Sequence, residues 1–161
     1  MLKEIEVNKG EIIQRKGDLN SKIYAVKQGL IRTYSIDDKG KEHVFMFAPE
    51  GWIVADAAAV TGPAELYIEA LEDSILQAMN AESEIAKASP LALMKRIAIL
   101  QKRSLMLLSA SAIERYEDFL ETYPDIVQRV PQKMIASYLG ITPEALSKVK
   151  GESIKSRTKL S

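Results

Sequence analysis

The chain has 161 residues, 47% of them hydrophobic, with 22 basic and 22 acidic side chains, so it can bury a core in one large or two small domains. No apolar run approaches the roughly 18 residues of a membrane span, and the charged first residues lack the apolar stretch of a signal peptide. Cysteine is absent and His43 is the sole histidine, which excludes disulfides and multi-histidine metal sites and indicates a reducing, cytoplasmic compartment.

Residues 1–79 show the short alternating pattern of β-strands. Strands are expected at residues 23–26, 30–36, 43–47, 66–71 and 74–79. The sequence Asp-Asp-Lys-Gly at 37–40 is a hairpin turn signal. Many short strands at this spacing predict a sandwich, barrel or jelly-roll, and we assign a β-domain to residues 1–88.

Residues 51–59 interrupt the alternation, and we expect a short helix or an irregular loop there. Gly62 and Pro63 then turn the chain back. A jelly-roll encloses a pocket, and a short helix that caps such a pocket can hold an anion. This segment is therefore where a small ligand would be expected.

From Ser89 the hydrophobic period becomes helical, and a helix of about 20 residues is predicted to begin at Pro90. One apolar stripe consists of Leu93, Ile97, Leu100, Ser104 and Leu107, and the adjacent one of Met94, Ala98, Gln101, Leu105 and Leu108. Two stripes need two partners. The first stripe is expected to form a dimer interface, and the other to cover the β-domain. Residues 89–110 are thus predicted to be a connecting and dimerisation helix, the alternative being one wide stripe buried within a subunit.

A second helix is predicted from Ser111 to Thr122, with Ile113, Tyr116 and Leu120 on its packing side. Tyr123 and Pro124 end it. Residues 111–161 form the C-terminal domain, and the polar segment after Lys150 is expected to fray.

Residues 131–150 have the pattern of a helix-turn-helix, two short helices joined by a tight turn. Gly140 suits the left-handed backbone at the turn, and Ala136 is small enough for the helices to cross closely. Thr142 suits the cap of the second helix and Pro143 its first position. The apolar positions are Ile135, Leu139, Ile141, Leu146 and Val149. An ordinary αα-hairpin in a helical core is the alternative.

Charge is unevenly distributed along the chain. Residues 131–161 carry six basic and two acidic side chains, a net charge of +4, whereas residues 1–130 have a net charge of −4. A basic segment on an acidic body is suited to local contact with phosphates.

The order β-roll, long helix, helix-turn-helix resembles the Crp/Fnr family of bacterial transcription regulators. The similar stretches are residues 9–11, 17–18, 23–34, 37–45, 50–52 and 67–74, together with 112–124 and 130–150, which look most like a branch common in Bacteroidetes-type bacteria. The resemblance implies an α+β fold with a cyclic-nucleotide-binding-like jelly-roll, a homodimer joined through the long helix, and a recognition helix in the DNA major groove. A two-fold symmetric dimer would read an inverted repeat with half-sites about 34 Å apart; RNA polymerase is a further partner to be expected.

The resemblance also points to an effector pocket with altered residues. Cyclic-AMP-binding members have a Glu for the ribose and an Arg followed by Ser or Thr for the phosphate; Trp52, Ala64 and Glu65 stand at these positions here. The cation is lost and a carboxylate is placed beside the phosphate, so we predict no binding of cyclic nucleotides. No cofactor is expected, because the sensor cysteines of the iron–sulfur branch and a haem ligand set are missing. His43 is expected to be a half-buried strand residue and Trp52 a core residue.

At the DNA end, family members often read bases with Arg, Glu and Arg. Glu144 matches the Glu, Lys148 the second Arg, and Pro143 replaces the first. Further contacts to phosphates or base edges are expected from Thr142, Ser147, Lys133 and Lys150. The strands of a full wing are not expected after the recognition helix, which predicts weaker or more salt-sensitive binding.

The sequence leaves two other classes of function to weigh. A small-molecule-binding β-roll with a vestigial helix-turn-helix agrees with the overall charge of zero. An enzyme of cupin type needs several histidines for its metal, and the chain has one. The motifs of serine hydrolases, P-loop proteins and Rossmann enzymes are absent as well, so we predict a regulator and not an enzyme.

Overall fold

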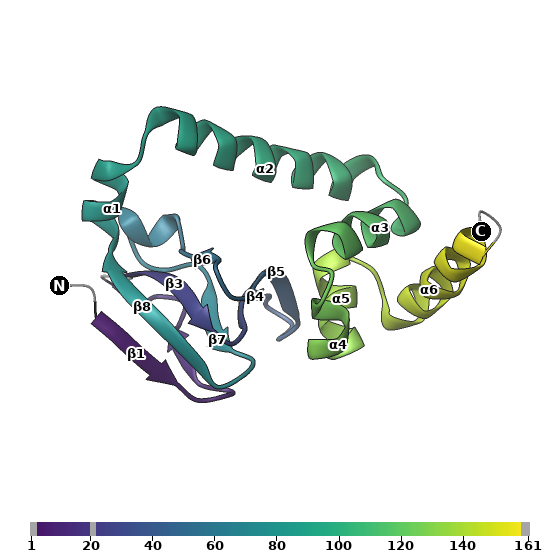
Figure 1. Ribbon diagram of the computed structural model, residues 1–161, viewed down its shortest axis with the longest axis horizontal. Helices are drawn as coiled ribbons and strands as arrows, with labels where there is room; N and C mark the ends of the chain where they lie inside the picture. Colours follow the sequence, from purple (N-terminus) through teal and green to yellow (C-terminus); the bar gives the residue numbers. More distant parts are fainter. Residues whose placement is uncertain (1–2, 20–21, 159–161) are drawn as a thin grey trace. The chain divides into compact units, whose positions relative to one another are not determined.

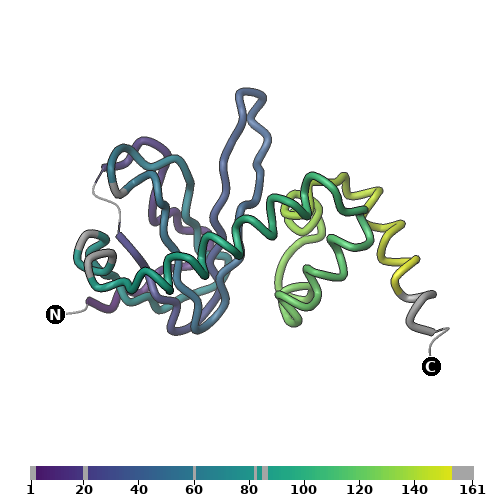
Figure 2. Tube along the Cα trace, turned by 90° about the horizontal axis from the view of Figure 1, so that it is seen from above, coloured from purple at the N-terminus to yellow at the C-terminus, as the bar shows by residue number. Residues whose placement is uncertain are grey.

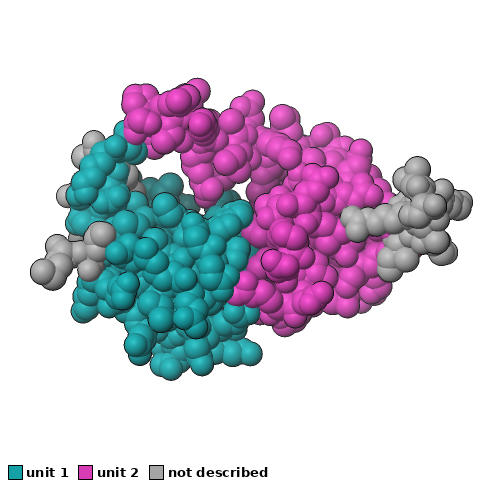
Figure 3. Space-filling model, in the orientation of Figure 1, with its two compact units in different colours: residues 1–88 teal, residues 89–161 magenta. Residues whose placement is uncertain are grey.

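The computed structural model describes residues 3–19 and 22–158 of the chain (Figure 1). The chain forms two compact units, residues 1–88 and residues 89–161, which are coloured separately in Figure 3. Among the described helices, none has both the length and the apolar character that crossing a membrane requires.

The first unit is a β-roll of antiparallel strands. These are β1 (Lys3–Val7), β2 (Ile12–Gln14), β3 (Lys22–Gln28), β4 (Ile31–Ile36), β5 (Glu42–Ala48), β6 (Ile53–Val54), β7 (Tyr67–Ala70) and β8 (Ser74–Asn80). Within the described residues one sheet has the order β1-β8-β3-β6 and the other the order β2-β7-β4-β5. The hairpin of β4 and β5 extends as a two-stranded ribbon (Figure 2). The predicted jelly-roll and its strands are confirmed.

Aliphatic side chains from both sheets form the core of this unit. Val26, Ile31, Val54, Ile68 and Leu76 are at most 1% exposed. Side chains alternate between the two faces of a strand, so β3, β5, β7 and β8 each contribute residues two positions apart to this core. Burial of one such side chain stabilises a fold by about 1.5–3 kcal/mol.

The second unit is helical. Its elements are α2 (Pro90–Ser109), α3 (Ala112–Thr122), α4 (Ile126–Arg129), α5 (Gln132–Leu139) and α6 (Pro143–Thr158). Ser89 caps α2 by accepting a hydrogen bond from the N–H of Ala92. Ser111 caps α3 in a reciprocal box with Glu114. The predicted starts of both helices are therefore confirmed.

The core of the helical unit joins α3, α5 and α6. Phe119, Ile135 and Leu146 come from these three helices, and none of them is exposed to solvent. Tyr116 is also buried, as predicted from the period of α3, whereas Phe119 was not among the predicted packing residues. This shared core fixes the helix-turn-helix against α3.

Several expectations were wrong or incomplete. The helices α1 (Ala81–Lys87) and α4 were not predicted, because helices this short show no clear period. The segment after Lys150, predicted to fray, belongs to α6 as far as Thr158. The region 51–59 contains β6 and the start of the 3-10 helix η1 (Ala58–Val60).

His43 lies on β5 with its side chain 47% exposed, in agreement with the prediction of a half-buried strand residue. Its Nε2 lies 2.8 Å from a carboxylate oxygen of Asp37 at the tip of the β4–β5 hairpin. The exposed half of the side chain follows from its position near the start of the strand, next to the exposed turn.

Candidate nucleic-acid interface

The turn between α5 and α6 has the geometry predicted for a helix-turn-helix. Gly140 ends α5 in the left-handed region, with φ 68° and ψ 31°. The N–H of Ile141 then donates to the carbonyl oxygen of Ala136 at 3.0 Å, which closes the turn. A Cβ added to Gly140 would meet its nearest neighbours at 3.6 Å, an ordinary contact. Glycine is therefore required here by backbone conformation and not by lack of space.

Thr142 caps α6. Its Oγ1 accepts a hydrogen bond from the N–H of Ala145 at 3.2 Å, and its carbonyl oxygen accepts from Leu146 at 3.0 Å. Glu144 lies in the first turn of the helix. Its own backbone N–H, and after it the Thr142 hydroxyl, hold the pKa of the Glu144 carboxyl below its usual value. The carboxylate at this end of α6 is therefore ionised and available as a hydrogen-bond acceptor at neutral pH.

The two faces of the motif differ sharply in burial. The inner face is buried at Ile135, Ala136, Leu139, Leu146 and Val149. The outer face is exposed at Thr142, Pro143, Glu144, Ser147 and Lys148. A motif that is packed on one side and polar on the other can present the start of α6 to another molecule.

The basic residues of the predicted interface are not equivalent. The Lys148 side chain is 79% exposed, with its Nζ 4.0 Å from Glu152 one turn further along α6. Lys133, near the start of α5, is exposed, whereas Lys150 is half-buried. The Ser147 hydroxyl donates to the carbonyl oxygen of Pro143 at 3.1 Å, so it can meet DNA as an acceptor.

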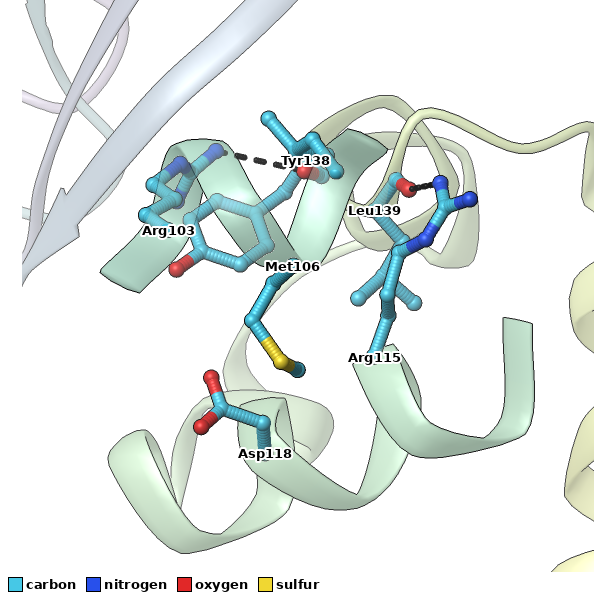
Figure 4. Close-up of a pocket in the computed structure, with 7 residues that line it drawn as sticks. Arg103, Met106, Arg115, Asp118, Tyr138 and Leu139 are labelled. Atoms are coloured by element: carbon cyan, nitrogen blue, oxygen red, sulfur yellow. Dashed lines mark hydrogen bonds between the residues drawn. The ribbon is translucent and has the colours of Figure 1, made fainter. Parts of the chain in front are cut away.

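Two arginines hold the end of α5, and neither was identified from the sequence. Arg103 of α2 donates to the carbonyl oxygen of Tyr138 at 3.2 Å, and its guanidinium lies 3.7 Å above the Tyr138 ring (Figure 4). Arg115 of α3 donates to the carbonyl oxygen of Leu139 at 2.9 Å. These carbonyls are the ones that a helix leaves unpaired at its C-terminus, where positive charge is favourable.

The same side chains line a shallow, open hollow between α2, α3 and α5 (Figure 4). Tyr138, which lines the hollow, also packs its ring with those of Phe119 and Tyr123, with centroids 5.4 to 5.5 Å apart. Burial raises the pKa of the Tyr138 hydroxyl. The residues that line the hollow are therefore the ones that hold the helix-turn-helix in place.

In the β-roll, the three predicted effector positions have different environments. Trp52 is half-buried and packs against the core, in agreement with the prediction of a core residue. Ala64 is 2% exposed, so it offers no polar group to a ligand. Glu65 is exposed, and its backbone N–H is bound by the buried carboxylate of Asp56. Asp56 was not identified from the sequence.

The predicted dimerisation helix α2 keeps its apolar side chains in solvent. None of its residues is buried in the single chain. The exposed fractions are 46% for Leu93, 54% for Ile97 and 41% for Leu107, while Leu100 is half-buried and Ser104 exposed. Such a continuous apolar surface is a mark of an interaction site.

A β-roll followed by a helix-turn-helix with an exposed second helix is the arrangement of a DNA-binding regulator. Residues 4–87 match the cyclic nucleotide-binding domain family. The chain belongs to this family and, within it, to the Crp/Fnr transcription regulators. It is accordingly a regulator and not an enzyme.

Among its relatives is the regulatory protein HlyX of Actinobacillus pleuropneumoniae, 28% identical over 170 residues that cover 93% of this chain and 71% of HlyX. The transcriptional activator protein Anr of Pseudomonas protegens is 25% identical over 167 residues, which cover 89% of this chain and 67% of Anr. Among solved structures, FixK2 from Bradyrhizobium japonicum has a TM-score of 0.77 at 21% identity, covering 97% of this chain and 86% of FixK2. A CRP/FNR-family regulator from Thermus thermophilus has a TM-score of 0.72 at 19% identity, covering 96% of this chain and 87% of its own. The structural neighbours support the fold.

Proposed function

We propose that this regulator acts as a homodimer in the cytoplasm, binds an inverted repeat of double-stranded DNA through α6, and does so without a cyclic nucleotide. The observation that carries the proposal is the contrast between the two faces of α6. Its inner side is fixed by Leu146 and Val149 in the core, while Glu144 and Lys148 project from the outer side. A rigid helix with exposed polar groups at its start can enter the major groove.

Each outer residue has a chemical role that fits this placement. The Glu144 carboxylate accepts a hydrogen bond from a cytosine amine, and the Lys148 ammonium donates to guanine acceptors. Thr142 and Ser147 contact base edges or phosphates, and Lys133 and Lys150 contact phosphates. Lys148 is well suited to this role because its ion pair with Glu152 is long and exposed, and such a pair is given up at little cost.

Dimerisation is supported by the apolar surface of α2. Leu93, Ile97 and Leu107 lie on one side of the helix and are 41–54% exposed. Packing against the same helix of a second copy would remove these side chains from water. It would also give the two copies of α6 the two-fold relation that an inverted repeat requires. Contact with RNA polymerase would follow at a promoter.

Independence from cyclic nucleotides is supported by the residues of the β-roll. Ala64 lacks a cation and is buried, and Glu65 carries a negative charge. A nucleotide phosphate would meet repulsion and no compensating charge there. Uptake of cyclic AMP at micromolar concentration in calorimetry would contradict this part of the proposal.

Selection of bound duplexes from a random DNA library, carried out at two salt concentrations, tests the proposal. We expect enrichment of an inverted repeat, with half-sites about one helical turn apart. The variant K148A should lose the enriched motif, whereas K39A, which removes an exposed lysine at the β4–β5 turn, should retain it. Recovery of no motif at either salt concentration would overturn the proposal and favour a small-molecule-binding module.

A further inference from the structure

A buried carboxylate lies in the loop between β6 and β7. Asp56 is 5% exposed. Its Oδ2 accepts hydrogen bonds from the backbone N–H groups of Glu65 and Leu66, each at 2.8 Å, and its Oδ1 accepts from Ala58 at 3.0 Å. Backbone N–H groups that converge on one point form a binding place for an anion. Here the carboxylate of the same loop fills that place.

The surrounding chain holds these N–H groups in position. The carbonyl oxygen of Ala64, next to the two donors, accepts a hydrogen bond from the N–H of Gly17 at 2.8 Å, and the Ala64 N–H donates to the carbonyl oxygen of Asp18 at 2.9 Å. It is also 2% exposed. The segment that carries the Glu65 and Leu66 donors is therefore fixed from outside the loop, and its geometry does not depend on Asp56 alone.

Gln14 supplies an independent observation. This side chain of β2 is 3% exposed, and its Nε2 donates to Asp56 Oδ2 at 3.2 Å and to the carbonyl oxygen of Leu66 at 2.9 Å. Its Oε1 has no hydrogen-bond partner in the described part of the chain. Exchanging the amide oxygen and nitrogen of Gln14 would not remove the problem, because Oε1 would then face the Asp56 carboxylate and the Leu66 carbonyl oxygen. Gln14 thus gives both of its donors to this site and leaves a buried acceptor unpaired.

All the hydrogen bonds that the structure gives Asp56 come from uncharged N–H groups. Such a set stabilises one negative charge well, but it cannot hold a second anion beside the first, because two like charges repel in a site with little water. The Glu65 amide is also at the position that the family resemblance assigns to phosphate contact. An incoming phosphate would therefore compete with Asp56 for the same donors.

We propose that the loop of residues 56–66 is an anion-binding cradle occupied by the chain's own Asp56, and that Asp56 is the residue that excludes phosphate-bearing ligands from the β-roll. The inference deepens the proposed independence from cyclic nucleotides by naming its cause. It does not depend on DNA binding, so the two can fail separately.

The test is rescue of an Asp56→Ala variant by added anions. Thermal unfolding of the full chain is followed in sodium chloride and in sodium phosphate, formate or acetate at matched ionic strength and pH. The variant should unfold at a lower temperature than the wild type in chloride. Phosphate or a small carboxylate should raise its Tm by about 3 °C or more, while the wild type shows no such difference.

Two matched variants separate occupation of the cradle from general effects of salt. Asp56→Asn keeps the side chain in place and should be destabilised without being rescued. Asp73→Ala removes an exposed carboxylate that accepts one backbone N–H, from Lys9 at 2.9 Å, and should not respond to the anion. Calorimetry should then detect binding of inorganic phosphate to Asp56→Ala and none to the wild type.

Every outcome bears on the proposal. If Asp56→Ala is unfolded in chloride, recovery of its circular dichroism signal in phosphate or formate supports the cradle as directly as a shift in Tm. If Asp56→Ala behaves identically in all the anions, whether folded or not, the cradle does not exist. An equal anion effect on the wild type would show that Asp56 does not occupy the site.

Discussion

Arg115 on α3 donates a hydrogen bond from Nη1 to the carbonyl oxygen of Leu139, the last residue of α5, at a distance of 2.9 Å. Its Nε donates at the same time to the carbonyl oxygen of Ala110, at the end of α2, at 3.1 Å. One side chain therefore joins the ends of two helices through the rigid fork of a guanidinium. This contact links the helix-turn-helix to α2 and α3.

The first prediction concerns this link. Arg115→Ala should lower the free energy of unfolding by about 1–3 kcal/mol, because two half-buried carbonyls lose a charged donor. Arg115→Lys should recover only part of the loss, since an ammonium cannot reproduce the fork. Urea denaturation measures both, with Lys95→Ala on the exposed surface of α2 as the control. Equal stability of Arg115→Ala and the control would contradict the assigned role.

The second prediction uses two glycines of the C-terminal unit. Gly140→Ala should destabilise the protein by about 1 kcal/mol, because φ is 68° and Ala is strained in that region. Gly151→Ala should instead stabilise it by about 0.5–1 kcal/mol, because Gly151 lies within α6 with nothing within 4 Å of an added Cβ. Chemical denaturation of both variants shows whether each substitution lowers or raises the free energy of unfolding. A gain of stability for Gly140→Ala would show that the turn does not require a left-handed residue.

The third prediction concerns the cap of α3. Ser111→Ala should lower the free energy of unfolding by about 1 kcal/mol at pH 7, because the N–H of Glu114 loses its acceptor. The Ser111 hydroxyl, followed by its backbone N–H, lowers the pKa of the Glu114 carboxyl below its ordinary value of 4.5. A lowered pKa in the folded state means that the contribution is present above pH 4.5 and disappears as the pH falls through the lowered value.

The pH dependence supplies the check on this third prediction. The difference in stability between the wild type and Ser111→Ala should be large at pH 7 and smaller at about pH 3. An NMR titration should place the pKa of Glu114 nearer its ordinary value in the variant. A difference that grows as the pH falls would mean that Glu114 is not held by Ser111.

Local signals in the sequence predicted much of this structure. Capping residues and a helical period located α2, α3 and the helix-turn-helix, because both depend on neighbouring residues in the chain. Asp56 and Arg115 could not be recognised in this way. Asp56 bonds with residues up to 42 positions away in the sequence, and Arg115 with a carbonyl 24 positions away. Such pairs follow from tertiary packing, for which a single sequence contains no local pattern.

The continuation of α6 shows the opposite kind of failure. The polar segment after Lys150 was expected to fray, as chain ends commonly do. The structure keeps Gly151 helical, and Ser153 beyond it is buried at 3% exposure. Burial of Ser153, two residues further along, stabilises the helix past the glycine. Propensity is overridden where a helix face packs against a neighbour.

The fourth prediction tests the recognition residues. Lys148→Ala should weaken binding to the selected operator by about 1–3 kcal/mol and relax its preference at one base pair. Lys133→Ala should weaken binding to all duplexes alike and reduce the dependence on salt, because a phosphate contact carries no sequence information. Fluorescence anisotropy with operator and scrambled duplexes distinguishes the two. Unchanged affinity of Lys148→Ala for the operator would remove Lys148 from the interface.

The last prediction addresses the dimer. Ile97 is 54% exposed on α2, in the stripe with Leu93 and Leu107. Ile97→Glu would place an unpaired charge in the proposed interface, where such a charge costs about 3–5 kcal/mol. The dissociation constant of the dimer should therefore rise by on the order of 100-fold or more. Lys95→Glu is the matched control, because two helical positions are about 200° apart and Lys95 lies on the other side.

Sedimentation equilibrium over a range of concentrations measures the association of all three proteins. The wild type and Lys95→Glu should dimerise alike, and Ile97→Glu should be monomeric while keeping its circular dichroism spectrum. The monomeric variant should also lose affinity for an inverted repeat more than for a single half-site, because joining two α6 helices in one particle raises their effective concentration at the second half-site. A dimer that survives Ile97→Glu would place the interface elsewhere on the chain.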